Sequence, residues 1–269
     1  MNIKKLQSIC YEMRKTILET SFNCQESAHI GGALSMVEIL AVLYHRIMKL
    51  NLSNPKDRFI LSKGHGFLGL LSVLKSKKII DKKILNDFQV DNSEIIAHPI
   101  MNPKIGIETS NGSLGQGLSY GVGLAIAYKL KKKRNSIYVM IGDGECYEGS
   151  IWEAAITATD QRLDNLTALL DVNGFQNDGE TSANMDFNSL DKKWKGFGWN
   201  TILSDGHNLN TIISSFRKIK RNKPNIIIFK TTKGKGIDFM ENNNDWHHGR
   251  LTKNLLETSL ENLKKRYVY

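Results

Sequence analysis

Five short apolar runs, separated by segments long enough to form helices, limit the possible folds of this chain more than any other feature. They are RFILS (58–62), SIYVMI (136–141), LTALLD (166–171), WNTIL (199–203) and PNIIIFK (224–230). Each run is apolar at odd and even positions alike, which is typical of strands buried on both faces. Apolar residues at helical spacing occupy 3–22, 34–50, 66–76, 81–89, 115–131 and 148–160. The pattern predicts an α/β fold, with a parallel sheet covered by helices on both faces.

The composition excludes several classes of protein. The chain has 37 Lys and Arg against 27 Asp and Glu, a net charge of +10. The densest basic run, Lys131 to Arg134, has no interleaved aromatic residues that could stack on bases, so we expect a solvated face and no nucleic-acid partner. Cys10, Cys24 and Cys146 lack the spacing of a disulfide framework or a zinc site. With neither a signal-like segment nor an apolar run of membrane length, we expect a cytoplasmic protein without a membrane partner.

Polar residues follow two of the predicted strands where the strands end. Asp143 follows SIYVMI within GDGE, and Asn173 follows LTALLD within VNGFQNDG, about one βαβ unit later. Neighbouring parallel strands would place this carboxylate and this amide oxygen side by side, and such hard donors suit Mg²⁺ or Ca²⁺. The Gly144 amide and a helix that begins near Glu148 would add an anion site, so a metal-bridged diphosphate is the simplest ligand. The alternative is that Asp143 caps a helix and Asn173 occupies a turn.

Glycine recurs in the helix predicted over 115–131, at Gly115, Gly117, Gly121 and Gly123. Alanine would favour a helix by about 1 kcal/mol at each position. The repeated glycine therefore indicates close approach, either by a neighbouring backbone or by a cofactor.

Five segments together resemble the N-terminal part of transketolases. GDGECYEG followed by DVNGFQNDG looks like the thiamine diphosphate motif of that family. SAHIGGALSMVEIL, DRFILSKGHG, ETSNGSLGQGLSYGVGLAIA and GKGIDFMENNNDWHHG resemble other segments of the family, in the same order along the chain. The resemblance covers nearly the whole chain and implies a single diphosphate-binding domain over residues 1–269, with thiamine diphosphate and a divalent ion, Mg²⁺ or else Ca²⁺ or Mn²⁺.

The resemblance also assigns roles to individual positions. It implies that Asp143, Asn173 and the Phe175 carbonyl hold the metal and that Gly144 contacts the diphosphate. Leu114 matches the residue that packs near the thiazolium ring. Glu148 matches a glutamate that faces the partner's active site and joins a hydrogen-bond path between paired thiamines. The remaining residues counted as cofactor-binding lie inside these motifs: Gly112, Ser113, Gly142 and Glu145. The family assigns Glu145 no role, and the alternative for it is a carboxylate near a helix N-terminus.

The histidines divide into two groups. By resemblance, His29 and His247 would touch the cofactor diphosphate and the reaction centre, and His65 and His98 would lie near the substrate hydroxyls and the thiazolium. His248 adjoins His247 and is an alternative to it as the functional residue, although we favour His247 because it follows Trp246 directly. Catalysis would use histidines with pKa values near neutrality.

Two histidines and one cysteine are expected to have ordinary roles. His45 and His207 match no motif position. Cys146 lies inside the motif, but we interpret it as a small core residue, because the nucleophile of this chemistry belongs to the cofactor.

We expect this chain to be without two of the domains that complete transketolases contain. After the glycine-rich and WHHG segments, only one amphipathic, lysine-rich helix is predicted, LTKNLLETSLENLKKR. The chain therefore resembles the N-terminal subunit of a split transketolase. We expect an obligate partner that carries the pyrimidine-binding domain, in an α₂β₂ assembly that transfers a two-carbon ketol unit from a ketose (phosphate) donor to an aldose acceptor. The alternatives are another thiamine enzyme, such as a deoxyxylulose-phosphate synthase or the α subunit of a 2-oxoacid dehydrogenase, and a non-catalytic scaffold subunit.

Overall fold

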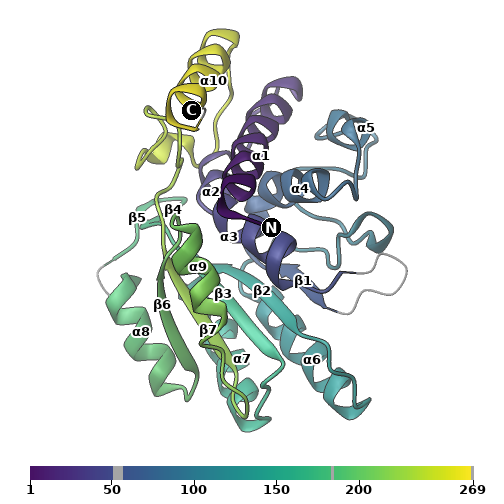
Figure 1. Cartoon of the computed structure of the whole chain (residues 1–269), viewed down its shortest axis with the longest axis vertical. Helices are drawn as coiled ribbons and strands as arrows, with labels where there is room; N and C mark the ends of the chain where they lie inside the picture. Colours follow the sequence, from purple (N-terminus) through teal and green to yellow (C-terminus); the bar gives the residue numbers. More distant parts are fainter. Residues whose placement is uncertain (51–56, 183–184, 268–269) are drawn as a thin grey trace.

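One parallel sheet of five strands forms the centre of the molecule in the computed structural model, which describes residues 1–50, 57–182 and 185–267 (Figure 1). The strand order is β1-β2-β3-β7-β6, and every neighbouring pair is parallel. The strands are β1 (Arg58–Leu61), β2 (Ile137–Gly142), β3 (Leu166–Val172), β6 (Asn200–Asp205) and β7 (Asn225–Lys230). The five predicted strands and the parallel sheet are confirmed.

Helices cover both faces of this sheet, as predicted. The first layer contains α1 (Ile3–Asn23), α2 (Gly31–Leu34), α3 (Val37–Val42), α4 (Phe67–Ser76) and α9 (Leu209–Phe216). The second layer contains α6 (Gln116–Leu130), α7 (Gly149–Asp160) and α8 (Phe187–Gly196). Strand side chains alternate between the layers: Met140 packs in the first, and Val139 and Ile141 pack in the second. Because side chains of a strand alternate in direction, both parities of each strand must be apolar.

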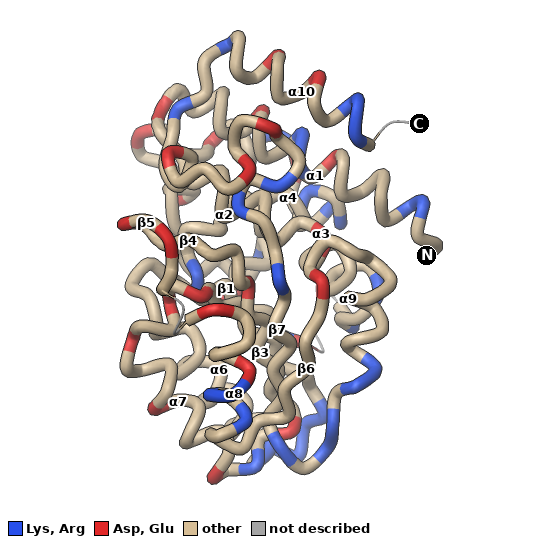
Figure 2. Tube along the Cα trace, turned by 90° about the vertical axis from the view of Figure 1, so that its left-hand side faces the viewer, with Lys and Arg blue, Asp and Glu red and all other residues tan. Residues whose placement is uncertain are grey.

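The remaining elements lie around these layers. α5 (Lys82–Asn86) follows α4 and is shorter than the helix predicted over 81–89, and α10 (Lys253–Tyr267) packs along α1 (Figure 1). β4 (Phe175–Gln176) and β5 (Gly179–Glu180) form a small antiparallel ribbon after β3. Figure 2 shows acidic and basic residues along much of the trace. None of the helices in the described part of the chain is long and apolar enough to cross a membrane.

The single helix predicted over 34–50 is wrong. α3 covers only six residues, and a π turn at Leu43–Ile47 follows it. The backbone leaves the helical region at Met36, with φ −104° and ψ 9°. Just before this break, the Ser35 hydroxyl lies 2.6 Å from Asp171 Oδ2, to which it donates a hydrogen bond. The chain therefore bends where a side chain is drawn toward the end of β3.

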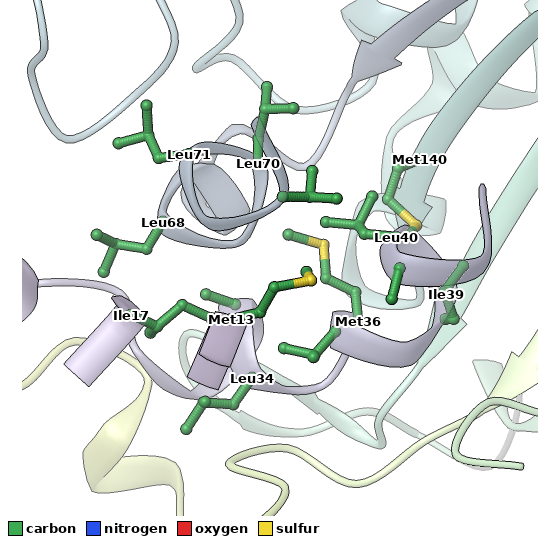
Figure 3. Close-up of a cluster of buried hydrophobic side chains, with 14 of the residues drawn as sticks. Met13, Ile17, Leu34, Met36, Ile39, Leu40, Leu68, Leu70, Leu71 and Met140 are labelled. Carbon is green, nitrogen blue, oxygen red and sulfur yellow. The ribbon is translucent and has the colours of Figure 1, made fainter. Parts of the chain in front are cut away.

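Met36 packs deep in the first layer. Figure 3 shows Met13, Met36 and Met140 among the leucine and isoleucine side chains of this cluster. A Cβ at Gly66 or Gly69 would come within 2.6 or 2.5 Å of Met36 Cε, so these two glycines make room for the methionine. A flexible thioether fills such an irregular gap well.

The glycines of α6 serve mainly to bring this helix close to the sheet. A Cβ at Gly117 would lie 2.5 Å from Ser62 Cβ, and one at Gly121 would lie 2.6 Å from Val139 Cγ2. Gly123 has no neighbouring atom within 4 Å of a built Cβ. Of the two predicted causes of close approach, neighbouring protein atoms account for Gly117 and Gly121.

Candidate functional site

Asp143 and Asn173 lie side by side at the carboxyl edge of the sheet, as their spacing predicted. The register of β2 and β3 pairs Gly142 with Asp171, so the residues after these strands meet. Gly174 N donates to Asp143 Oδ2 over 2.7 Å, and Gly144 N donates to Asp143 Oδ1 over 3.0 Å. Asp143 therefore also caps the short 3₁₀ helix that follows it, and the capping alternative and the ligand prediction are compatible.

The surroundings of Asp143 suit a bound cation. Its side chain is buried, and this burial, together with the charge of Asp171, raises its pKa to about 7. Within the described ranges, no group of three His, Cys, Asp or Glu side chains could hold a metal ion. A cation would therefore depend on a mixed set of oxygen donors, namely the side chains of Asp143 and Asn173 and the Phe175 carbonyl. Such a set fits Mg²⁺ and leaves coordination positions for other ligands.

Asp171, the second buried carboxylate at this edge, is neutralised by Lys63. Lys63 Nζ lies 2.5 Å from Asp171 Oδ2, and neither side chain is exposed. Burial alone would raise the pKa of Asp171, but the Lys63 charge outweighs it and lowers this pKa. Asn173 Nδ2 donates to Asp171 Oδ2 over 3.4 Å, while Asn173 Oδ1 accepts from Phe175 N over 3.1 Å. Asp171 thus orients the amide so that its oxygen points away from the carboxylate.

A second lysine, Lys233, reaches the same edge from the segment after β7. Its ammonium donates to Asn244 Oδ1 over 2.6 Å and to His247 Nδ1 over 2.8 Å, and it lies 5.5 Å from the centroid of the Phe175 ring. Burial and the nearby charge of Lys63 lower the pKa of Lys233 to about 8. Two buried ammonium groups beside the predicted cation site are suited to an anionic ligand with several oxygens.

Neither lysine nor Asp171 is among the residues expected from the sequence. Each had one signal: Lys63 follows the RFILS run directly, Lys233 directly precedes Gly234 shortly after a predicted strand, and Asp171 is a charged residue in a run otherwise apolar on both faces. These signals do not tell which charged residues are buried together.

The five motif histidines gather around His29. The centroid of its ring lies 5.9 Å from that of His65, 5.4 Å from that of His98, 5.5 Å from that of His247 and 4.5 Å from that of His248. The segments that carry them are far apart in sequence: His29 lies just before α2, His65 follows β1, His98 lies in the loop after α5, and His247 and His248 precede α10. The structure therefore brings together all the histidines that the motifs singled out.

Their protonation differs from the sequence prediction of pKa values near neutrality. Burial is the main cause that lowers the pKa of His29 to about 3 and that of His247 to about 4, and it also lowers those of His65 and His98. Because their pKa values are lowered, these rings are neutral at pH 7. Because the Lys233 ammonium can only donate, His247 Nδ1 must accept, and the ring proton is on Nε2. Among the described residues, His29 Nδ1 is buried without a hydrogen-bond partner.

Glu145, predicted among the cofactor-binding residues, is hydrogen-bonded to protein groups at the start of α6. The side chain is buried. Oε1 accepts from Gly115 N over 2.8 Å and from the Ser62 hydroxyl, and Oε2 accepts from Gly142 N over 3.1 Å. The alternative of a carboxylate at a helix N-terminus fits this geometry, but the helix is α6, because Gly115 is the residue that precedes it.

Glu148 lies on the surface next to the loop that contains Leu114. It is exposed and immediately precedes α7, and a Cβ on Gly115 would come 2.8 Å from Glu148 Cβ. Gly112 and Ser113 are also exposed, and Leu114 is half-buried. This rim is accessible to a second chain.

Cys146 packs in the second layer, as expected for a core residue. It is buried, and its thiol donates to Gly142 O over 3.5 Å. Burial raises the pKa of this thiol well above its usual value, so it is no nucleophile.

Comparisons with known proteins agree on one family. The family described as "Transketolase, thiamine diphosphate binding domain" matches residues 11–269. The chain is 40% identical over 243 residues to the 6-deoxy-6-sulfo-D-fructose transketolase subunit of Clostridium sp. (strain MSTE9), covering 88% of each chain. It is 37% identical over 272 residues to an apulose-4-phosphate transketolase subunit of Phocaeicola vulgatus, covering 99% of this chain and 96% of that one.

Solved transketolases share the fold. The transketolase of Leishmania mexicana superposes with a TM-score of 0.86 at 26% identity, over 99% of this chain and 41% of that one. The transketolase of Campylobacter jejuni superposes with a TM-score of 0.85 at 28% identity, over 98% of this chain and 43% of that one. The chain thus spans less than half the length of these solved enzymes. The motifs, the site and these matches together show that the chain belongs to the transketolase family and carries its N-terminal, thiamine diphosphate-binding domain.

Proposed function

We propose that this chain is the cofactor-binding subunit of a split, cytoplasmic transketolase. It would act with a C-terminal subunit that carries the pyrimidine-binding domain, as an α₂β₂ heterotetramer. The complex would transfer a two-carbon ketol unit from a ketose or ketose phosphate to an aldose. The relatives of similar length are transketolase subunits by name. The observation that carries the proposal is the convergence of Asp143, Asn173, two buried lysines and five histidines at one edge of the sheet.

The residues at this edge fit a metal-bound diphosphate. Asp143, Asn173 and the Phe175 carbonyl would hold Mg²⁺, or else Ca²⁺ or Mn²⁺. Lys233, whose ammonium already meets His247, would offset the charge of the diphosphate, and Gly144 would lie against it. Thiamine diphosphate, when bound, supplies the carbon nucleophile and the electron sink for cleavage of the ketose C2–C3 bond.

The histidines would bind and orient the sugar. Burial keeps them neutral, so each ring offers one N–H donor and one acceptor nitrogen. His65 and His98 would hydrogen-bond the donor oxygens, and the buried Nδ1 of His29, which has no protein partner, would pair with a ligand atom. His247 already hydrogen-bonds Lys233 and the backbone of Gln176, so it would hold the lysine beside the anionic ligand. Glu148, exposed beside the Leu114 loop, would meet the partner subunit.

Calorimetric titration tests this proposal. Thiamine diphosphate with Mg²⁺ is titrated into this chain alone and into its mixture with the product of the neighbouring gene. We expect weak or undetectable binding to the chain alone, tight binding to the mixture, and ketol transfer by the mixture only. Asp143→Ala should abolish the tight binding. Asp186→Asn, at the exposed cap of α8, is the matched control and should leave it unchanged. Lack of binding in the wild-type mixture would refute the function and favour a scaffold role.

A further inference from the structure

The segment that carries Lys233 is held from both sides by two side chains of distant elements. Thr232 N donates to His207 Nε2 over 2.8 Å, on one side of the lysine. On the other side, Arg14 Nε donates to Lys235 O over 2.9 Å. His207 lies between β6 and α9, and Arg14 lies on α1. The backbone around Lys233 is therefore anchored on both sides to side chains of the first layer.

A single buried carboxylate, Glu38 of α3, holds both of these side chains. Arg14 Nη1 lies 2.7 Å from Glu38 Oε1, and Arg14 Nη2 donates to Oε2 over 2.9 Å. His207 Nδ1 lies 3.1 Å from the same Oε2. Because Thr232 N–H must donate to Nε2, the ring proton of His207 is on Nδ1 and donates to Glu38. We call Glu38, Arg14 and His207 the Glu38 clamp.

We infer that the Glu38 clamp positions Lys233 for the anionic ligand of the site, and that His207 is a positioning residue within it. The inference rests on the proposed function, since it takes that ligand to be the diphosphate. The Lys233 side chain runs through a tight passage, where a Cβ on Gly31 would lie 3.1 Å from its Cγ, and its ammonium meets His247 at 2.8 Å. A displacement of the backbone at Thr232 would move the ammonium relative to the histidine cluster.

Two substitutions at His207 separate its two contacts. Glutamine places an amide group near the position of Nε2, where its oxygen can still accept from Thr232 N–H. Asparagine places its amide near Nδ1, where it can donate to Glu38 but leaves Thr232 N–H without its acceptor. We expect His207→Asn to weaken thiamine diphosphate binding to the assembled complex by about tenfold. His207→Gln should stay within about threefold of the wild type, and His45→Asn, at a half-buried histidine bonded to Ser76, should change nothing.

A double-mutant cycle with Lys233→Met tests whether the effect passes through the lysine. If His207 acts by positioning Lys233, then His207→Asn should change affinity by less than about twofold once the ammonium is absent. A purely structural role would leave the tenfold loss intact in the Lys233→Met background and would overturn the inference. Unchanged affinity of His207→Asn in the wild-type background would also overturn it. If the wild-type complex binds no thiamine diphosphate, the proposed function fails. If the wild-type complex binds it, and Lys233→Met weakens the binding while His207→Asn does not, only the inference about the Glu38 clamp fails.

Discussion

Replacing Glu145 with glutamine should loosen the loop that carries Leu114 without removing any side-chain volume. In the wild type the carboxylate accepts hydrogen bonds from Gly115 N, Gly142 N and the Ser62 hydroxyl, in a buried pocket. A carboxylate has lone pairs for all three donors. A glutamine amide can turn its oxygen toward only one side, so its NH₂ group must face at least one of these donors.

The cost of this change follows from the unsatisfied donor. Leaving one buried N–H without its acceptor costs about 1–3 kcal/mol. Burial raises the pKa of Glu145, so the wild-type charge is itself held at some cost, and the lower half of that range is the better expectation. A chain of this size loses roughly 2–4 °C in its unfolding midpoint for each kcal/mol. Glu145→Gln should therefore lower the midpoint by roughly 2–8 °C.

Thermal denaturation and amide hydrogen exchange measure the two parts of this prediction. The amide that faces the glutamine NH₂ group, that of Gly115 or that of Gly142, should exchange roughly tenfold faster in Glu145→Gln, while amides in the middle of β3 should change only with global stability. Glu153→Gln, at an exposed position of α7, is the matched control and should leave both readings unchanged. If Glu145→Gln unfolds at the wild-type temperature and the amides of Gly115 and Gly142 both exchange at the wild-type rate, the carboxylate does not anchor the loop.

Two further predictions concern stability. Burial opposes the charge of Glu38, but the charge of Arg14 outweighs it and lowers the Glu38 pKa to about 2 from a usual 4.5. Ionised Glu38 therefore adds about 3 kcal/mol to the free energy of unfolding. This contribution is present above pH 4.5 and is lost as the pH falls toward 2. Urea denaturation should show the wild type losing about 2 kcal/mol more than Glu38→Gln between pH 6 and pH 3, and parallel pH profiles would contradict this. Gly121→Ala should destabilise the protein by about 1 kcal/mol, because the new Cβ would come 2.6 Å from Val139 Cγ2. Gly123→Ala has open space around its Cβ and should stabilise the protein by about 0.5–1 kcal/mol. Equal unfolding midpoints for the two variants would exclude this packing argument.

Much of the fold and part of the site could be predicted from local sequence patterns. A strand of a doubly covered sheet must be apolar on both parities, so β1, β2, β3, β6 and β7 were recognisable individually. Asp143 and Asn173 could be predicted as neighbours because both directly follow strands one βαβ unit apart. The histidines were identified from their motifs, and the structure brings them together around His29.

Only the tertiary structure decided which charged residues meet in the interior. Lys63 and Asp171 are 108 residues apart in sequence, and Glu38 and His207 are 169 apart. Local patterns do not tell which of these charged residues pair with each other. The break at Met36 and the inward orientation of Glu145 likewise depend on neighbours from other elements. Apolar periodicity records which side of an element faces the core, whereas a buried ion pair depends on how separate elements pack, and that information is distributed over the whole chain.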